Sequence, residues 1–226
     1  MTRVSWAMWA IVRKDLAIEL RTREMLSSLF LLAFLVVLVF AFALEPERLA
    51  GAEVAAGLLW ASVLFAGTLS LDRSFGIERE AGAWTALALL PIDRGSVYLA
   101  KAAANAIVLL IGTAALLPLI ALLLGTRGIA PSAVLPVVVL LGVAGIAAIG
   151  TLCAAIATRS RARAVLMPLL TFPLLSPVLI AAARATAGAL VGRSASEVGS
   201  WLLVLGGFDI VFLTAGWLTF DYVLEE

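Results

Sequence analysis

Few side chains in this chain could carry out chemistry, and the residue types that are missing are informative. The sequence contains no His and a single Cys, Cys153, which lies in an apolar run. The lack of His excludes His-ligated metal or haem sites and acid–base catalysis by imidazole. No GxxxxGK(S/T) motif occurs, so the chain lacks the usual P-loop for ATP. We therefore predict a non-catalytic protein with no metal site and no cofactor of its own.

One carboxylate stands inside the last apolar segment of the chain. Asp209 lies about a third of the way into it. An ionisable group in such a segment is costly and usually faces the protein interior or water. Two interpretations are open at this stage: Asp209 contacts a neighbouring helix or a polar part of a substrate, or it is hydrogen-bonded to nearby Ser, Thr or backbone groups.

The residues from 72 to 101 form the longest polar stretch between apolar segments. Six of its residues are candidates for contacts with a partner protein, and they mix apolar and charged side chains: Phe75, Ile77, Glu78, Arg79, Glu80 and Gly82. Gly82 permits a turn or a helix end, and charges flanked by apolar residues are typical of a short helix on a membrane face. The alternative is an ordinary solvated loop.

Most of the chain consists of apolar segments long enough to cross a membrane. Hydrophobic residues make up 63% of the 226 residues and charged residues 14%, whereas soluble domains average about 45–50% and 25%. A spanning helix needs about 20 apolar residues. The sequence therefore predicts an all-α polytopic membrane protein, a single domain with six spans. We place them at residues 25–44, 54–71, 102–124, 129–158, 164–183 and 201–223.

The N-terminal residues 3–23 are amphipathic rather than uniformly apolar. Trp and aliphatic residues recur at three- and four-residue steps, which predicts a helix in the membrane interface. This helix is either a topology anchor or an elbow that transmits motion to the first span. Twelve of the sixteen Lys and Arg residues fall on the same side as this segment. The positive-inside rule then places both termini in the cytoplasm. The net charge of only +1 gives no reason to expect a nucleic-acid partner.

Three prolines, Pro168, Pro173 and Pro177, interrupt the fifth span. Each removes a backbone donor and tends to kink a helix, so the segment is a candidate hinge or a static bend.

Taken together, these segments resemble the permease subunits of type 2 ABC exporters, and among them the cytochrome c maturation protein B family, also called haem exporter protein B. The resemblance covers nearly the whole chain in order. It is carried by RKDLAIELRTRE, LLWASVLFAGTLSLDRSF, GAWTALALLPIDRGSVYLAK, MPLLTFPLLSPVLIAAARAT and FDIVFLTAGWLTFDYVLEE.

This resemblance implies a subunit of an ABC complex in the bacterial inner membrane, acting in haem transport and cytochrome c biogenesis. The implied partners are a cytoplasmic ATPase, cytochrome c maturation protein A, together with proteins C and D and, indirectly, the haem chaperone protein E. ATP would bind to the partner, and haem would be a substrate of the complex. The loop 72–101 would carry the coupling helix that docks on the ATPase through the six candidate contact residues, with Phe75 and Ile77 filling an apolar groove on it. The alternatives are a type 2 ABC permease for a lipid, glycan or drug, and a secondary transporter without an ATPase.

Overall fold

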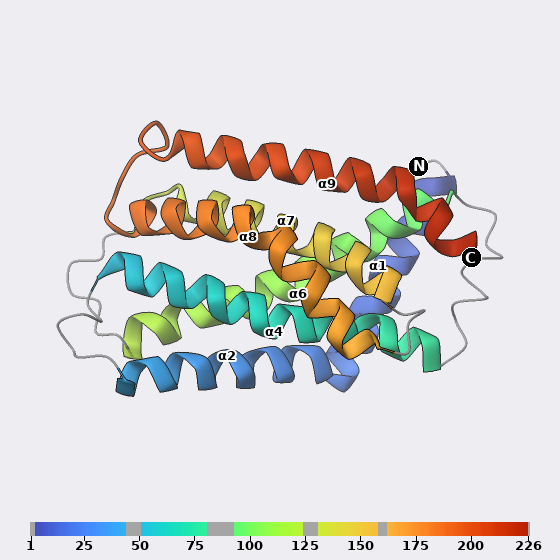
Figure 1. Cartoon of the computed structure of the whole chain (residues 1–226), viewed down its shortest axis with the longest axis horizontal. Coiled ribbons are helices and arrows are strands. Elements are labelled where there is room, and N and C mark those ends of the chain that lie inside the picture. Colours follow the sequence, from blue (N-terminus) through green and yellow to red (C-terminus); the bar gives the residue numbers. More distant parts are fainter. Residues whose placement is uncertain (1–2, 44–50, 81–92, 124–130, 158–161, 226) are drawn as a thin grey trace.

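The computed structural model describes residues 3–43, 51–80, 93–123, 131–157 and 162–225. Helices fill nearly all of these ranges (Figure 1): α1 (Arg3–Thr22), α2 (Glu24–Ala43), α4 (Ala52–Glu80), α6 (Arg94–Leu123), α7 (Leu135–Ala157), α8 (Arg163–Leu190) and α9 (Gly199–Glu225). Six of them, α2 to α9, are long and apolar enough to span a membrane. The predicted all-α polytopic fold is confirmed.

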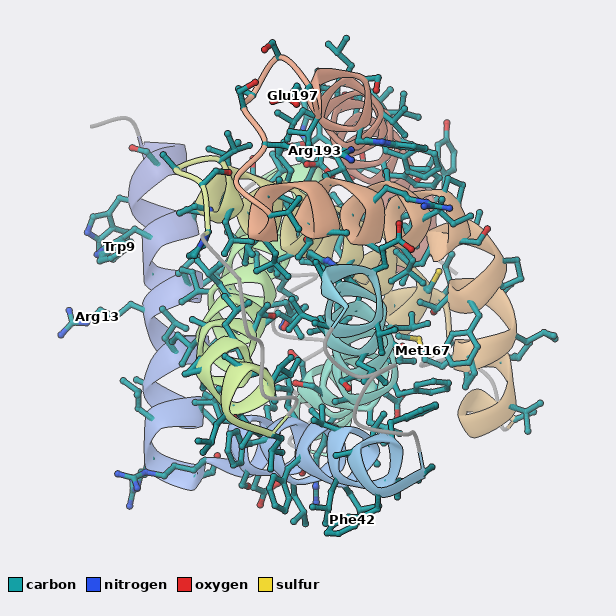
Figure 2. The ribbon with its side chains drawn as sticks, turned by 90° about the vertical axis from the view of Figure 1, so that its left-hand side faces the viewer. Trp9, Arg13, Phe42, Met167, Arg193 and Glu197 are labelled. Atoms are coloured by element: carbon teal, nitrogen blue, oxygen red, sulfur yellow. The ribbon has the colours of Figure 1, made fainter. Side chains whose placement is uncertain are left out.

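The six long helices run along one bundle axis, and α1 lies across it. Figure 1 shows both chain termini at the same end of the bundle, which we call the termini end. In Figure 2 the long helices are seen nearly end-on, while α1 stands beside them at right angles to the bundle axis. α4 and α7 are the most buried spans, and α2 and α9 are among the most exposed. A transverse α1 at the termini end is the arrangement that an interfacial helix requires.

Buried polar side chains join the spans where helices pack closely. The Trp60 indole donates a hydrogen bond to Thr186 (2.9 Å), and Tyr98 donates to the backbone carbonyl of Ala148 (3.0 Å). The Trp60 ring lies where a side chain at Gly142 would have to be, so glycine is required at this α4–α7 crossing. Close backbone approach and satisfied polar groups are how apolar spans associate within lipid.

Several helix boundaries differ from those predicted. α4 continues past residue 71 to Glu80, and α6 begins at Arg94 rather than at 102. Charged residues end an apolar segment but do not end a helix, because Glu, Lys and Arg are good helix formers. α7 begins at Leu135, not at 129, since Pro136 fits only the first turn of a helix.

α8 is one continuous helix through its three internal prolines. Figure 1 shows it changing direction along its length, with its N-terminal part sloping away from the line of its C-terminal part. Pro177 cannot donate to the carbonyl of Pro173, and the Ser176 hydroxyl donates to that oxygen instead (2.8 Å). The predicted interruption is therefore a bend. Whether α8 also acts as a hinge stays a prediction.

Candidate functional site

A buried ammonium group links three helices at the termini end. The Lys101 side chain, on the first turns of α6, is only 1% exposed. Its Nζ lies 3.3 Å from Asp15 Oδ2 on α1 and 4.9 Å from the centre of the Phe75 ring on α4. A lysine is almost never fully buried unless it is paired, and both a carboxylate and an aromatic face stabilise its charge. We call Asp15, Phe75 and Lys101 the junction cluster.

The position of Phe75 corrects one expectation. Its side chain has no exposed surface, so in this structure the ring cannot fill a groove on a partner protein. The physical reason is that α4 stays helical to Glu80, which keeps Phe75 on the face that packs against Lys101 rather than opening a separate surface helix. Ile77, Glu78, Arg79 and Glu80 form the last turns of α4. Their side chains, and Gly82, lie outside the described residues, so their docking role stays a prediction.

A second set of contacts fixes the angle between α1 and α2. Arg23 has a positive φ of 55° and separates the two helices. The Glu19 carboxylate, near the end of α1, accepts hydrogen bonds from the backbone N–H groups of Met25 (3.2 Å) and Leu26 (2.7 Å). These are orphan donors of the first turn of α2, and a carboxylate also suits the positive end of the helix dipole. α1 is therefore joined to the first span by a side-chain cap.

The end of α4 is also tied to the start of α2. Arg73 Nε lies 3.3 Å from Glu24 Oε2, and Arg73 donates to the Ser28 hydroxyl (3.2 Å). The termini end of α4 thus contacts α1 and α6 through the junction cluster and α2 through Arg73. Residues 81–92, which follow α4 and precede α6, are consequently bounded on both sides by helices that are linked to α1.

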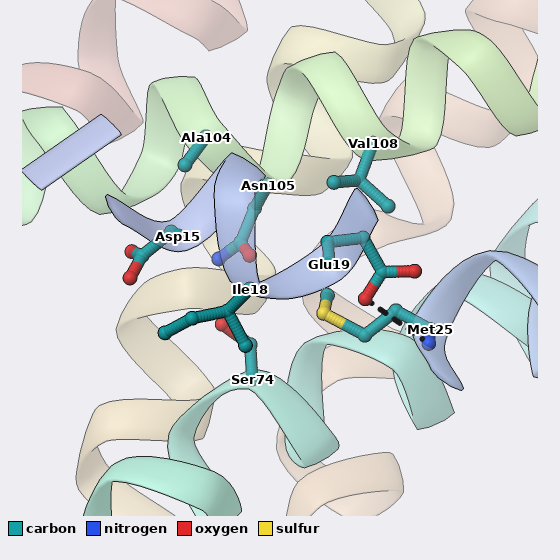
Figure 3. Close-up of a pocket in the computed structure, with 8 residues that line it drawn as sticks. All are labelled: Asp15, Ile18, Glu19, Met25, Ser74, Ala104, Asn105 and Val108. Atoms are coloured by element: carbon teal, nitrogen blue, oxygen red, sulfur yellow. Dashed lines mark hydrogen bonds between the residues drawn. The ribbon is translucent and has the colours of Figure 1, made fainter. Parts of the chain in front are cut away.

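A small pocket lies beside the junction cluster (Figure 3), lined by Asp15, Ile18, Glu19, Met25, Ser74, Ala104, Asn105 and Val108. Its volume is about 30 Å³, enough for one or two water molecules but not for an organic substrate. The Glu19 carboxylate and the Met25 N–H meet at its edge. The junction cluster and the Glu19 contacts therefore connect helices around a space that is too small for an organic substrate.

Asp209 is the second candidate site. It is buried, and neither carboxylate oxygen has a hydrogen-bond partner within the part of the chain that the structure describes. Oδ1 lies against Gly145 of α7, next to the Val178 side chain of α8. Val178 directly follows Pro177, so the buried acid and the bent helix, which the sequence shows as separate features, meet at one place. Of the two interpretations left open, a hydrogen bond from Asp209 to nearby Ser, Thr or backbone groups is not found among these residues.

Sequence reasoning did not single out Asp15, Glu19 or Lys101 as site residues. Lys101 directly precedes an apolar segment, where a cation usually reads as a topology signal. A usable sign of a buried partner was present in α1, where Asp15 and Glu19 are the only acidic residues of an otherwise basic helix. Within the described ranges, no group of three His, Cys, Asp or Glu side chains is placed to hold a metal ion.

Comparison with known proteins decides the family. The model of the CcmB protein family matches residues 6–224. The chain belongs to the CcmB protein family. Three relatives called heme exporter protein B are similar over most of their length. That of Rhodobacter capsulatus is 33% identical over 174 residues, which are 76% of this chain and 79% of the relative. That of Bradyrhizobium diazoefficiens is 30% identical over 93% of both chains. That of Pseudomonas aeruginosa is 30% identical over 82% of both.

Proposed function

We propose that this chain is the membrane permease subunit of an ABC transporter complex in cytochrome c maturation. A separate cytoplasmic subunit hydrolyses ATP, and this chain couples that work to haem export or to release of the haem-loaded periplasmic chaperone. The observation that carries the proposal is the full-length similarity to CcmB proteins, together with six spans and no internal ATP-binding motif. Haem is the substrate of the complex and not a cofactor of this chain.

The junction cluster supports a route for coupling. A partner that moves residues 81–92 pulls on the end of α4 and the start of α6 together. Because Lys101 joins α6 to Asp15 of α1 and stacks on Phe75 of α4, these three helices respond as one unit. Glu19 then passes the displacement to α2. In this proposal Phe75 is a positioning residue, and the partner contacts come from Ile77, Glu78, Arg79, Glu80 and Gly82.

The proposed setting is the bacterial inner membrane, with the termini end in the cytoplasm. This orientation puts α1, the end of α4 and residues 81–92 on the side where the ATPase, cytochrome c maturation protein A, is found. Proteins C and D of the same system would be further partners, and the chaperone protein E an indirect one. Of the basic residues at the opposite end, Arg184 pairs with Glu53 on an exposed surface (3.5 Å).

The test is retention of the ATPase by affinity-purified complexes. A variant with Glu78→Ala and Glu80→Ala should retain much less ATPase than the wild type at matched membrane expression. The matched control carries Glu53→Ala and Glu197→Ala, two acidic residues at the other end of the bundle, and should retain it fully. Equal retention by both variants would exclude coupling through the end of α4. If the wild-type chain purified without any ATPase, a secondary transporter would be favoured. If deletion of the chain abolished the export of another compound but left cytochrome c maturation intact, a different substrate would be favoured.

A further inference from the structure

The charges of α1 are sorted between its two faces. Its acidic residues turn toward the bundle, where Asp15 pairs with Lys101 and Glu19 caps α2. The opposite face carries Trp6 and Trp9, which are 68% and 58% exposed, and the exposed cation Arg13. Figure 2 shows Trp9 and Arg13 pointing away from the bundle on the outer side of α1. The outer face is therefore aromatic and positively charged, because both acidic residues of α1 lie on the inner face.

These outer residues surround an open groove. Its lining comes entirely from α1 and follows the helical repeat: Trp6, Trp9, Ala10, Arg13, Lys14 and Ala17. The stripe spans eleven residue steps, roughly 16 Å along the helix. The groove has a volume of about 310 Å³, ten times that of the pocket beside the junction cluster. Ala10 and Ala17 add only methyl groups to this lining, one before and one after Arg13 along the helix.

The chemistry of the groove fits one kind of occupant. A guanidinium binds a phosphate diester through paired hydrogen bonds, and indole rings favour the depth where glycerol and the upper acyl chains lie. α1 lies across the bundle axis at the termini end, so its outer face points sideways and not along that axis. An interfacial helix in this orientation turns such a face toward the lipid headgroups. The volume accommodates a headgroup with its glycerol, while the acyl chains extend into the bilayer.

We propose that the outer face of α1 is a binding site for an anionic phospholipid, whose phosphate contacts Arg13 and whose glycerol region packs against Trp6 and Trp9. The sorted charges of α1 and its groove support this lipid site independently of the proposed transport function. Lys14 adds positive charge at the site, although it also pairs with Asp15 at 2.9 Å.

The test is lipid binding to the full-length purified chain, measured by native mass spectrometry during titration with phosphatidylglycerol and with phosphatidylcholine. The wild type should bind phosphatidylglycerol more tightly than phosphatidylcholine, with a preference that falls as ionic strength rises. Arg13→Gln should weaken phosphatidylglycerol binding by about 5-fold, as expected for one cation at a lipid surface. Arg13→Lys should recover only part of this loss, because lysine keeps the positive charge but cannot form the paired hydrogen bonds. Trp9→Ala should weaken the binding of both lipids alike.

Arg193→Gln is the matched control, because Arg193 is an exposed arginine at the opposite end of the bundle. It should leave both affinities unchanged. Equal binding of the two lipids to the wild type would overturn the proposal, as would an effect of Arg193→Gln as large as that of Arg13→Gln. If Arg13→Gln left lipid binding intact but released a protein partner or dissociated a dimer, the groove would be a protein interface and the proposal would be wrong.

Discussion

Removing the counter-charge of Lys101 should destabilise this protein more than removing Lys101 itself. The Lys101 side chain is 1% exposed, while that of Asp15 is 17% exposed and its Oδ1 also lies 2.9 Å from Lys14 Nζ. Asp15→Asn therefore removes a carboxylate that lies beside a buried cation. Lys101→Met leaves a carboxylate that still reaches water and a second lysine. The two substitutions break the same contact but leave different residues behind.

The expected loss in the free energy of unfolding follows from how deeply Asp15 and Lys101 are buried. Breaking a buried ion pair from one side costs about 3–5 kcal/mol. The Phe75 ring still faces the ammonium, so Asp15→Asn should cost about 3 kcal/mol, at the lower end of that range. Lys101→Met keeps most of the apolar stem and should cost about 1 kcal/mol. The double variant lacks both the buried cation and the carboxylate beside it and should also cost about 1 kcal/mol, which gives a coupling energy near 3 kcal/mol.

The measurement is unfolding of the purified full chain by SDS in mixed micelles, followed by tryptophan fluorescence and circular dichroism. The matched control is the same cycle on Glu53 and Arg184, an exposed pair with a 3.5 Å contact, where the coupling should stay below about 0.5 kcal/mol. Additive single substitutions at Asp15 and Lys101 would refute the reasoning. So would a loss from Lys101→Met as large as that from Asp15→Asn.

Three further predictions concern the spans. Gly142→Val should lower the free energy of SDS unfolding by at least about 2 kcal/mol, because Trp60 occupies the space that the new side chain needs. Gly206→Val, on an open face of α9, should change this free energy little. Equal effects of the two substitutions would contradict the packing argument. Asp209→Asn should leave the free energy of unfolding unchanged or higher, since an amide is less costly to bury than a carboxylate. The same variant should support less cytochrome c maturation than the wild type when each is expressed in a strain that lacks this chain. A marked loss of stability would mean that the carboxylate has a structural partner. Pro177→Ala should lower maturation at equal membrane abundance if the bend of α8 moves during the cycle, and unchanged maturation would leave the bend static.

The sequence by itself determined the class of the protein and the number of its spans. Apolar runs of twenty residues or more have one stable form in lipid, a helix with all its backbone hydrogen bonds inside the segment. The amphipathic repeat of α1 was likewise readable, because Trp6 and Trp9 fall at helical spacing. The family was predictable too, since the resemblance extends through the chain in order. The class and the span count depend only on local pattern and length, whereas the family depends on a resemblance of the residues themselves along the chain.

Helix ends were less predictable because local composition does not mark where a helix stops. α4 and α6 each continue into charged sequence that hydropathy alone assigned to a loop. Phe75 was expected at a surface for this reason, although one uninterrupted helix turns it inward. The choice between a surface and a buried position depends on which neighbour covers the residue, and the neighbour here is Lys101 from a segment 26 residues away.

Only the tertiary structure decided which polar residues meet. Asp15 and Lys101 are 86 residues apart and pair because α1 folds back across the start of α6. Asp209 and the residue after Pro177 lie on different helices and come together at Gly145, where glycine lets the three spans approach. In an apolar interior an isolated charge is so costly that its partner determines where it can lie. The sequence shows which charges need a partner, and the packing of the helices supplies one to Lys101 but none to Asp209 among the described residues.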